Sequence, residues 1–119
     1  MPHGQELNQE MRQCIQNCLD CHRSCTETAT HCLQMGGKHA EASHLQLLLD
    51  CAQICATSAD FMLRVSRFHP DVCRICAEIC RACGEECSRM AEGDSTMQQC
   101  AENCSRCAQS CESMAGAAA

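Results

Sequence analysis

Apolar and cysteine side chains recur along the chain at intervals of three and four residues, the spacing that places them on one face of an α-helix. Glutamate, glutamine, arginine, aspartate and asparagine occupy the positions between them. No stretch alternates apolar and polar residues with a period of two, and the β-branched and aromatic runs typical of strands do not occur. The pattern therefore predicts an all-α protein.

Four segments carry this pattern, and short breakers separate them. The periodicity predicts helices over about 5–35, 40–68, 70–92 and 95–114. Gly36 and Gly37 end the first helix, Pro70 begins the third, and Ser95 to Gln98 has the spacing of a capping box. Because short loops make neighbouring helices antiparallel, we expect an up-down-up-down four-helix bundle. With 119 residues, the chain is expected to form a single metal-binding domain, 1–119.

The inward face of this predicted bundle consists mainly of cysteine. All 16 cysteines lie on the four apolar stripes, two of which extend to Met35 and Val65, whereas random placement would turn some outward. They are Cys14, Cys18, Cys21, Cys25, Cys32, Cys51, Cys55, Cys73, Cys76, Cys80, Cys83, Cys87, Cys100, Cys104, Cys107 and Cys111. Cysteine is much smaller than leucine, and large-to-small changes in a core cost about 2–5 kcal/mol each. We therefore interpret the thiols as metal ligands rather than core filler.

Most of these thiols fall into pairs with the spacing Cys-x-x-x-Cys. The seven pairs are Cys14/Cys18, Cys21/Cys25, Cys51/Cys55, Cys76/Cys80, Cys83/Cys87, Cys100/Cys104 and Cys107/Cys111. Residues four apart on a helix have Cβ atoms about 5–6 Å apart, so two sulfurs can hold one ion between them. Soft thiolate ligands select Cu(I), zinc or iron–sulfur clusters.

The balance of charge favours Cu(I) among these metals. One Cu(I) ion for each of the 16 thiolates gives a neutral core. Zinc at four cysteines per ion would leave eight uncompensated negative charges, and the stripes carry no lysine or arginine to offset them. Partial loading with some thiols still protonated would reduce this difference. A zinc or mixed-metal thiolate buffer, similar in role to metallothionein, therefore stays the alternative.

Other cysteine chemistries fit the pattern less well. The cysteine spacing lacks the C-x2-C-x2-C-x3-C-P run of bacterial iron–sulfur proteins. Dithiol redox catalysis by Cys-x-x-Cys usually occurs in a βαβ context, which this all-α pattern lacks. A disulfide scaffold needs an oxidising compartment, whereas we expect a reducing one. A copper chaperone would need few ions and an exposed site, whereas these cysteines face inward. We expect a storage protein and not an enzyme.

The composition also limits the compartment and the partners. The N-terminal residues show no basic and apolar leader, and no apolar run approaches the roughly 18 residues of a membrane span. We therefore expect a cytoplasmic protein with reduced thiols and no membrane partner. The net charge of −6 argues against nucleic acid as a partner, because phosphate binding needs clustered lysine and arginine.

The repeated Cys-x-x-x-Cys pairs on the first, third and fourth helices, Cys51/Cys55 on the second, and Met11 before Cys14 resemble the bacterial copper storage proteins. The resemblance covers about residues 5–114. It implies a four-helix bundle whose core holds many Cu(I) ions, of the order of one per cysteine. It also implies a homotetramer and the cytosolic branch of the family. The second helix departs from the pattern, because its N-terminal half carries His44 and leucines instead of cysteines.

The ends of the predicted bundle differ in their side chains. One end collects four candidate ligands for incoming copper: Met11, Met62, His69 and Met114. The other end collects His44, Met35, Met90, Met97 and leucines that can plug the core. We predict that the end with Met11 and His69 admits copper. The alternative is that the methionines fill the core and that His69 caps the third helix.

Overall fold

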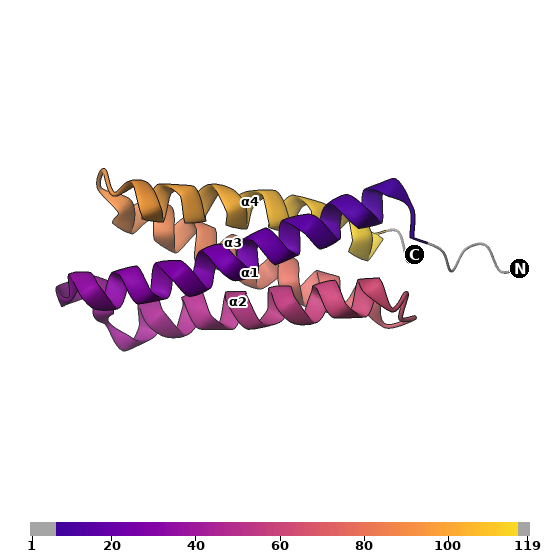
Figure 1. The fold of residues 1–119 in the computed structure, drawn as a ribbon, viewed down its shortest axis with the longest axis horizontal. Helices are drawn as coiled ribbons and strands as arrows, with labels where there is room; N and C mark the ends of the chain where they lie inside the picture. Colours follow the sequence, from indigo (N-terminus) through magenta and orange to yellow (C-terminus); the bar gives the residue numbers. More distant parts are fainter. Residues whose placement is uncertain (1–6, 117–119) are drawn as a thin grey trace, which may run out of the picture.

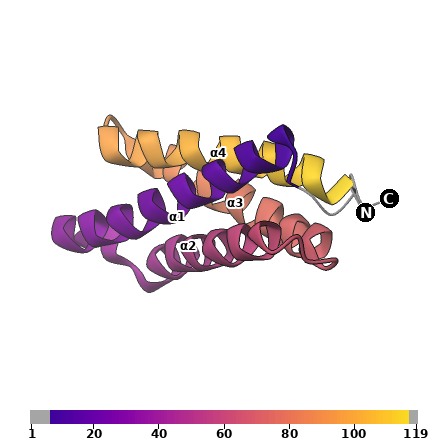
Figure 2. The same ribbon diagram turned by 45° about the vertical axis from the view of Figure 1, so that its right-hand side comes forward.

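The computed structural model describes residues 7–116, which form a four-helix bundle. The helices are α1 (Gln9–Met35), α2 (Ala42–Leu63), α3 (His69–Ala91) and α4 (Ser95–Gly116), and a short 3-10 helix, η2 (Gly37–Ala40), joins α1 to α2. α1 and α3 each pack against both α2 and α4 (Figures 1 and 2). The predicted all-α fold and four-helix bundle are confirmed, and no strand occurs between residues 7 and 116.

Helix α1 begins and ends at local signals that the sequence contains. Asn8 caps its N-terminus, because its side-chain oxygen accepts a hydrogen bond of 2.8 Å from the Met11 backbone N–H. The prediction of a helix from residue 5 is wrong at Leu7 and Asn8, because Asn8 is the cap and Gln9 is the first helical residue, and residues 5 and 6 lie outside the described residues. Gly36 follows Met35 with a φ of 73°, a conformation that glycine adopts without strain and that ends the helix as predicted.

Met35 does not reach the core, contrary to the predicted stripe. Its side chain is 48% exposed, and Cys32 is the last buried residue of α1. A helix with 3.6 residues per turn rotates by about 20° per heptad relative to a repeat of 3.5. The stripe therefore turns away from the core by the last turn of this long helix.

Helix α2 ends at Leu63, so the predicted extension to Phe68 is wrong. The Val65 N–H donates to the Met62 carbonyl and the Ser66 N–H donates to the Phe61 carbonyl, each at 2.9 Å. This pair of bonds is a Schellman motif, which requires a left-handed residue after the helix. Val65 fills that position with a φ of 52°, where glycine is usual. Val65 is therefore not a core residue of α2, and no glycine marks the end of the helix in the sequence.

Relief of strain at Val65 should stabilise the fold. A left-handed conformation costs an L-residue about 1–2 kcal/mol, and a β-branched side chain is among the least tolerant. We expect Val65→Gly to raise the free energy of unfolding by about 1 kcal/mol, after allowance for the greater entropy of unfolded glycine. Urea unfolding of the reduced, metal-free protein measures this change. Val72→Gly, within α3, is the control and should destabilise; a loss of stability in Val65→Gly would contradict the strain.

Helices α3 and α4 match their predicted positions closely. α3 begins at His69 with Pro70 in its first turn, as the sequence indicated. α4 begins at Ser95, but its cap is the preceding residue, because the Met97 N–H donates to the Asp94 carboxylate at 3.0 Å. The resulting bundle measures 55 × 20 × 19 Å, and its long core runs from one end to the other. Among the helices of residues 7–116, none combines the length and the hydropathy that a membrane-spanning segment requires.

Candidate metal centre

The core of the bundle is a column of free thiols that all four helices contribute. Every one of the 16 cysteines has zero exposure to solvent, and none forms a disulfide. The spacing of three and four residues explains this burial, because it keeps each thiol on the helix face that meets the other helices. The predicted ligand residues are thus brought together in one interior.

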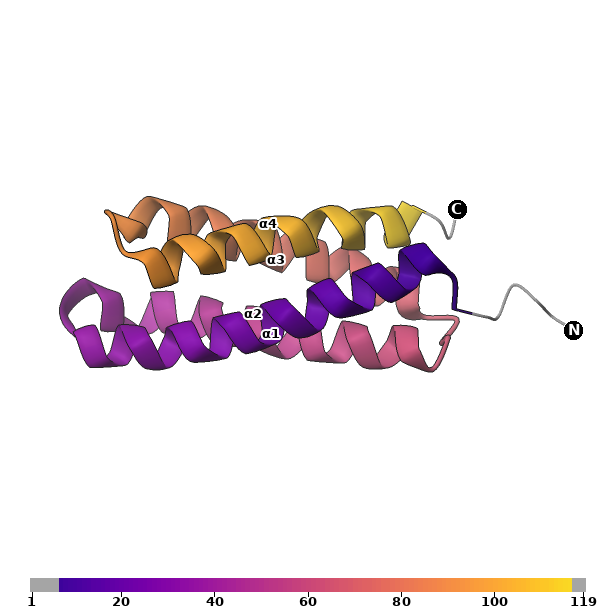
Figure 3. The ribbon, with the colours of Figure 1, turned by 45° about the horizontal axis from the view of Figure 1, so that its top comes forward.

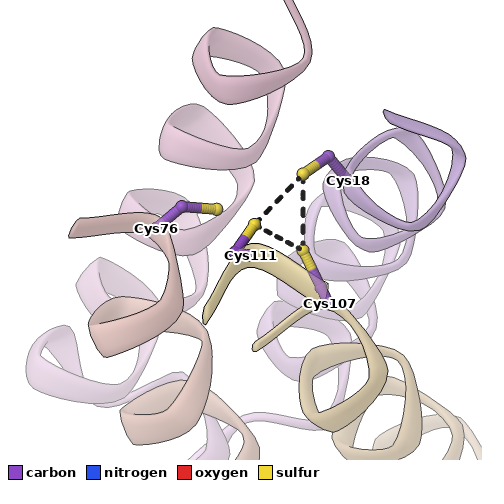
Figure 4. A group of neighbouring side chains, drawn as sticks. All are labelled: Cys18, Cys76, Cys107 and Cys111. Atoms are coloured by element: carbon purple, nitrogen blue, oxygen red, sulfur yellow. Dashed lines mark hydrogen bonds between the residues drawn. The ribbon is translucent and has the colours of Figure 1, made fainter. Parts of the chain in front are cut away.

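Four cysteines from α1, α3 and α4 illustrate the arrangement. The sulfurs of Cys18, Cys76, Cys107 and Cys111 all lie within 4.8 Å of one another and converge on a common point (Figure 4). The Cys18 sulfur is 3.6 Å from those of Cys107 and Cys111, and the latter two are 4.0 Å apart. These distances are van der Waals contacts between separate thiols, far longer than the roughly 2.05 Å of a disulfide bond. The four thiols can therefore all ligate metal.

Three further groups of four sulfurs meet the same 4.8 Å limit, and neighbouring groups share members. They are Cys55/Cys76/Cys80/Cys107, Cys21/Cys51/Cys55/Cys80 and Cys21/Cys25/Cys51/Cys104. Each consecutive pair of groups has two cysteines in common, so the four groups form an unbroken run through the centre of the core. An ion held in one group therefore lies next to sulfurs that also face the following group.

Contacts between helices are as short as those within a Cys-x-x-x-Cys pair. The sulfurs of Cys76 and Cys80, four residues apart on α3, are separated by 3.8 Å. The Cys80 sulfur lies only 3.4 Å from that of Cys55 on α2, and 3.6 Å from that of Cys51. The predicted pairs are therefore not isolated sites, because each sulfur can bridge to ions held by another helix.

The end of the bundle that was predicted to admit copper is lined by thioethers. Met11, Met62 and Met114 are all buried there, at 8%, 0% and 2% exposure. His69 lies at this end but is only half-buried, and its Nδ1 is 2.9 Å from the Ser66 carbonyl oxygen. Of the four candidate ligands, the three methionines thus belong to the core, whereas the His69 imidazole contacts the connection between α2 and α3.

The opposite end contains a histidine that sequence reasoning did not assign as a ligand. His44 is 1% exposed, and its Nε2 lies 3.4 Å from the Cys32 sulfur. Its Nδ1 faces a carboxylate oxygen of Glu86 at 3.4 Å. The steps from His44 to Leu48 and on to Cys51 are four and three residues, so the α2 stripe itself could have indicated this position. Of the leucines expected to plug this end, Leu48 is fully buried.

A protein-family model described as copper storage protein matches residues 7–116, nearly the whole chain. The chain belongs to the copper storage protein family. The predicted family resemblance is thereby confirmed.

Solved structures of copper storage proteins and related chains support this membership. The crystal structure of a Nitrosospira multiformis protein has a TM-score of 0.87 and 46% identity, covering 93% of this chain and 99% of that one. Cu(I)-bound copper storage protein BsCsp3 has a TM-score of 0.82 and 37% identity, covering 90% and 99%. A cytosolic copper storage protein from Streptomyces lividans, with five coppers, has a TM-score of 0.78 and 31% identity, covering 90% and 92%.

A curated relative also matches part of the chain. The uncharacterized cysteine-rich protein YhjQ of Bacillus subtilis (strain 168) is 37% identical over 71 residues. This segment covers 60% of the present chain and 66% of the relative.

Besides its thiols, the described core of this copper storage protein contains few ionisable side chains. The buried polar residues of the described chain are Asn17, Thr28, His44 and Ser58, and no lysine or arginine is among them. Burial raises the pKa of Cys32 to about 11, and the negative charges of Asp94 and Cys100 add to this effect. The Cys32 thiol is therefore protonated at neutral pH in the absence of metal, and copper that binds it as a thiolate must release its proton.

The raised pKa of Cys32 predicts that the metal-free protein loses stability at high pH. A group whose pKa is higher in the folded than in the unfolded state favours folding below its unfolded pKa. The ordinary thiol value is 9.0, and that of Cys32 in the folded core is about 11. We expect the free energy of unfolding to fall as pH rises from about 9 to 11, because deprotonation then favours the unfolded chain. Urea unfolding under anaerobic conditions with a reductant checks this; a constant free energy over that range would contradict it.

Proposed function

We propose that this chain stores Cu(I) in the cytoplasm and so protects the cell from free copper. The observation that carries the proposal is the continuous run of buried, unpaired thiols drawn from all four helices. All 16 cysteines are the proposed ligands, and the expected capacity is of the order of one Cu(I) per cysteine. The Cu(I)-bound state of family relatives supports this choice of metal. No catalytic role is proposed.

Electroneutrality of the core supports Cu(I) over zinc. Groups of four sulfurs resemble the tetrahedral ligand sets of structural zinc sites. However, neighbouring groups share two cysteines each, so each thiolate would have to serve two zinc ions or leave some ions incompletely ligated. Cu(I) accepts bridging thiolates, and one positive charge per thiolate balances the core without any buried lysine or arginine.

The end that contains Met11, Met62 and Met114 is the proposed mouth. Neutral thioethers can pass a soft cation inward without adding charge. Met11 precedes the first thiol of α1 by three residues and Met114 follows the last thiol of α4 by three, so each shares a helix face with that thiol. Cys14 and Cys111, which lie 3.7 Å apart, would receive the ion next. His69 is a less favourable ligand than the methionines, because its Nδ1 already contacts a backbone carbonyl.

The assembly and domain structure are proposed from the family and from the bundle. Membership of the copper storage protein family supports a homotetramer. The helices described for residues 7–116 all share one thiol core, which supports a single metal-binding domain. Neither feature is needed for the thiols to bind copper within one chain.

Competition between Cu(I) and zinc tests the proposed metal. Reduced protein is loaded with zinc under anaerobic conditions and then exposed to excess Cu(I). We expect Cu(I) to displace the zinc completely, with a gain in bound ions, because bridging thiolates hold more monovalent than divalent ions in a neutral core. Elemental analysis after desalting measures both metals. Retention of zinc against excess Cu(I) would overturn the proposal in favour of a zinc buffer.

A further inference from the structure

The segment 61–69, which we call the aromatic loop, comprises the last turn residues of α2, the connection that follows and the first residue of α3, and it combines apolar and cationic side chains at the surface. It contains Phe61 and Phe68, the two phenylalanines of a sequence without tryptophan or tyrosine. The guanidinium carbon of Arg64 lies 4.7 Å from the centroid of the Phe61 ring, and that of Arg67 lies 4.7 Å from the Phe68 ring. Phe68 is 51% exposed. Aromatic and arginine side chains of this kind dominate the energetics of protein–protein interfaces.

The aromatic loop itself carries two arginines, although Asp60 and Asp71 flank it and the protein as a whole is acidic. The loop contains Arg64 and Arg67 but no aspartate or glutamate, whereas the formal charge of the whole chain is −6. Within the part of the chain that the structure describes, neither arginine has a carboxylate within 4.0 Å. Both guanidinium groups are therefore available to carboxylates of another molecule.

The conformation of the aromatic loop is fixed before any partner binds. Val65 is held in the left-handed region by the Schellman motif that ends α2. The Phe68 N–H donates to the Ser66 hydroxyl at 3.1 Å, and the His69 ring nitrogen contacts the Ser66 carbonyl oxygen at 2.9 Å. Strained residues are often retained at functional sites, and a preorganised surface loses less entropy on binding.

The aromatic loop lies at the end of the bundle that contains the proposed mouth. It joins α2 to α3 at the end where α1 begins and α4 finishes (Figures 1 and 3). Met62 lies within the loop and is itself fully buried in the core. A molecule bound to the loop would therefore sit at the end of the bundle where copper is proposed to enter.

We propose that the aromatic loop is a docking surface for an acidic protein that exchanges Cu(I) with the core. This inference rests on the proposed storage function. The bundle is only about 20 × 19 Å across, so an end-on contact is small, as in weak and transient complexes. An acidic patch on a protein can pair with Arg64 and Arg67 locally. An anionic bilayer is a less favourable partner, because its extended negative surface would repel the acidic remainder of the chain.

The exchange changes ligands without changing the oxidation state of copper. A thiolate of the partner forms a bond to Cu(I) as a bond from Cu(I) to a core cysteine breaks. The proton released by the partner's thiol is taken up by the core thiolate, so that protons as well as charge balance. No oxidant or reductant is consumed, and the same steps in reverse load the core.

Transfer of Cu(I) to designed peptides tests the docking surface. The first peptide carries a Cys-x-x-Cys pair flanked by glutamates, and the second has glutamine at each glutamate position. We expect the acidic peptide to remove Cu(I) from the loaded protein about tenfold faster at low ionic strength, with the advantage lost at high salt. Arg64→Glu/Arg67→Glu should abolish this preference. Arg23→Glu/Arg106→Glu, an equal change of charge at exposed positions elsewhere, should retain most of it.

Two outcomes would overturn the docking proposal. The first is an equal rate for both peptides with the unaltered protein, or an equal loss of preference in both double variants. The second is cosedimentation with phosphatidylserine vesicles that Arg64→Glu/Arg67→Glu abolishes, which would assign the loop to a membrane.

Elemental analysis of each loaded protein keeps this test separate from the storage function. Failure of the unaltered protein to bind copper would contradict storage itself, whereas full loading with no charge preference contradicts docking alone.

Discussion

Replacement of Cys55 and Cys80 by serine is expected to lower the copper capacity by about twice as much as an equal replacement elsewhere. These two cysteines are 3.4 Å apart and belong together to two of the four sulfur groups. Their loss removes two ligands from each of these two groups and interrupts the run of sulfurs at its centre. Ions on both sides then lose a bridging thiolate.

Cys32→Ser/Cys87→Ser is the matched control for this experiment. Both residues are fully buried, but neither belongs to the four groups of mutually close sulfurs. The chemical change and the loss of thiols are the same in the two double variants. Anaerobic loading followed by elemental analysis measures the capacity, and circular dichroism of the metal-free proteins shows whether each is folded. Equal losses of copper in two folded variants would mean that the shared sulfurs have no special role.

Loading with copper is expected to raise the midpoint of thermal unfolding by tens of degrees. Each ligand that binds only the folded state contributes about 2.7 kcal/mol at a free concentration one hundred times its dissociation constant. Several ions together would exceed the 5–15 kcal/mol by which typical domains are stable. The effect requires binding sites that exist only when the helices are packed together. The structure meets this requirement, because every cysteine is buried between the helices.

Thermal unfolding followed by circular dichroism under anaerobic conditions measures this gain. Reduced protein is compared at zero, half and full loading. The variant Cys55→Ser/Cys80→Ser provides the control, because its smaller capacity should give a smaller rise in the midpoint. An unchanged midpoint at full loading would show that copper binds the unfolded chain as tightly as the folded one, as it would on independent surface thiols.

The sequence alone predicted the features that depend on local spacing. Steps of three and four residues gave the helices and the burial of all 16 cysteines, because the positions that share a helix face follow from helix geometry. Gly36 and Pro70 indicated helix boundaries for equally local reasons. The family resemblance followed from the same pattern.

Features that depend on the register between helices could not be predicted in this way. The 3.4 Å contact between Cys55 and Cys80 joins two helices whose relative shift no local motif specifies. The contact of His44 with Cys32 likewise requires α1 and α2 to align at one end. The end of α2 was missed because Val65 occupies a position where glycine is the usual signal.

Anaerobic titration of the reduced protein with Cu(I), with elemental analysis and simultaneous measurement of released protons, shows whether the core stores copper. We expect saturation at about one ion per cysteine, with protons released throughout the titration as neutral thiols become thiolate ligands. Saturation at only a few ions per chain, or binding without release of protons, would contradict a core that stores copper.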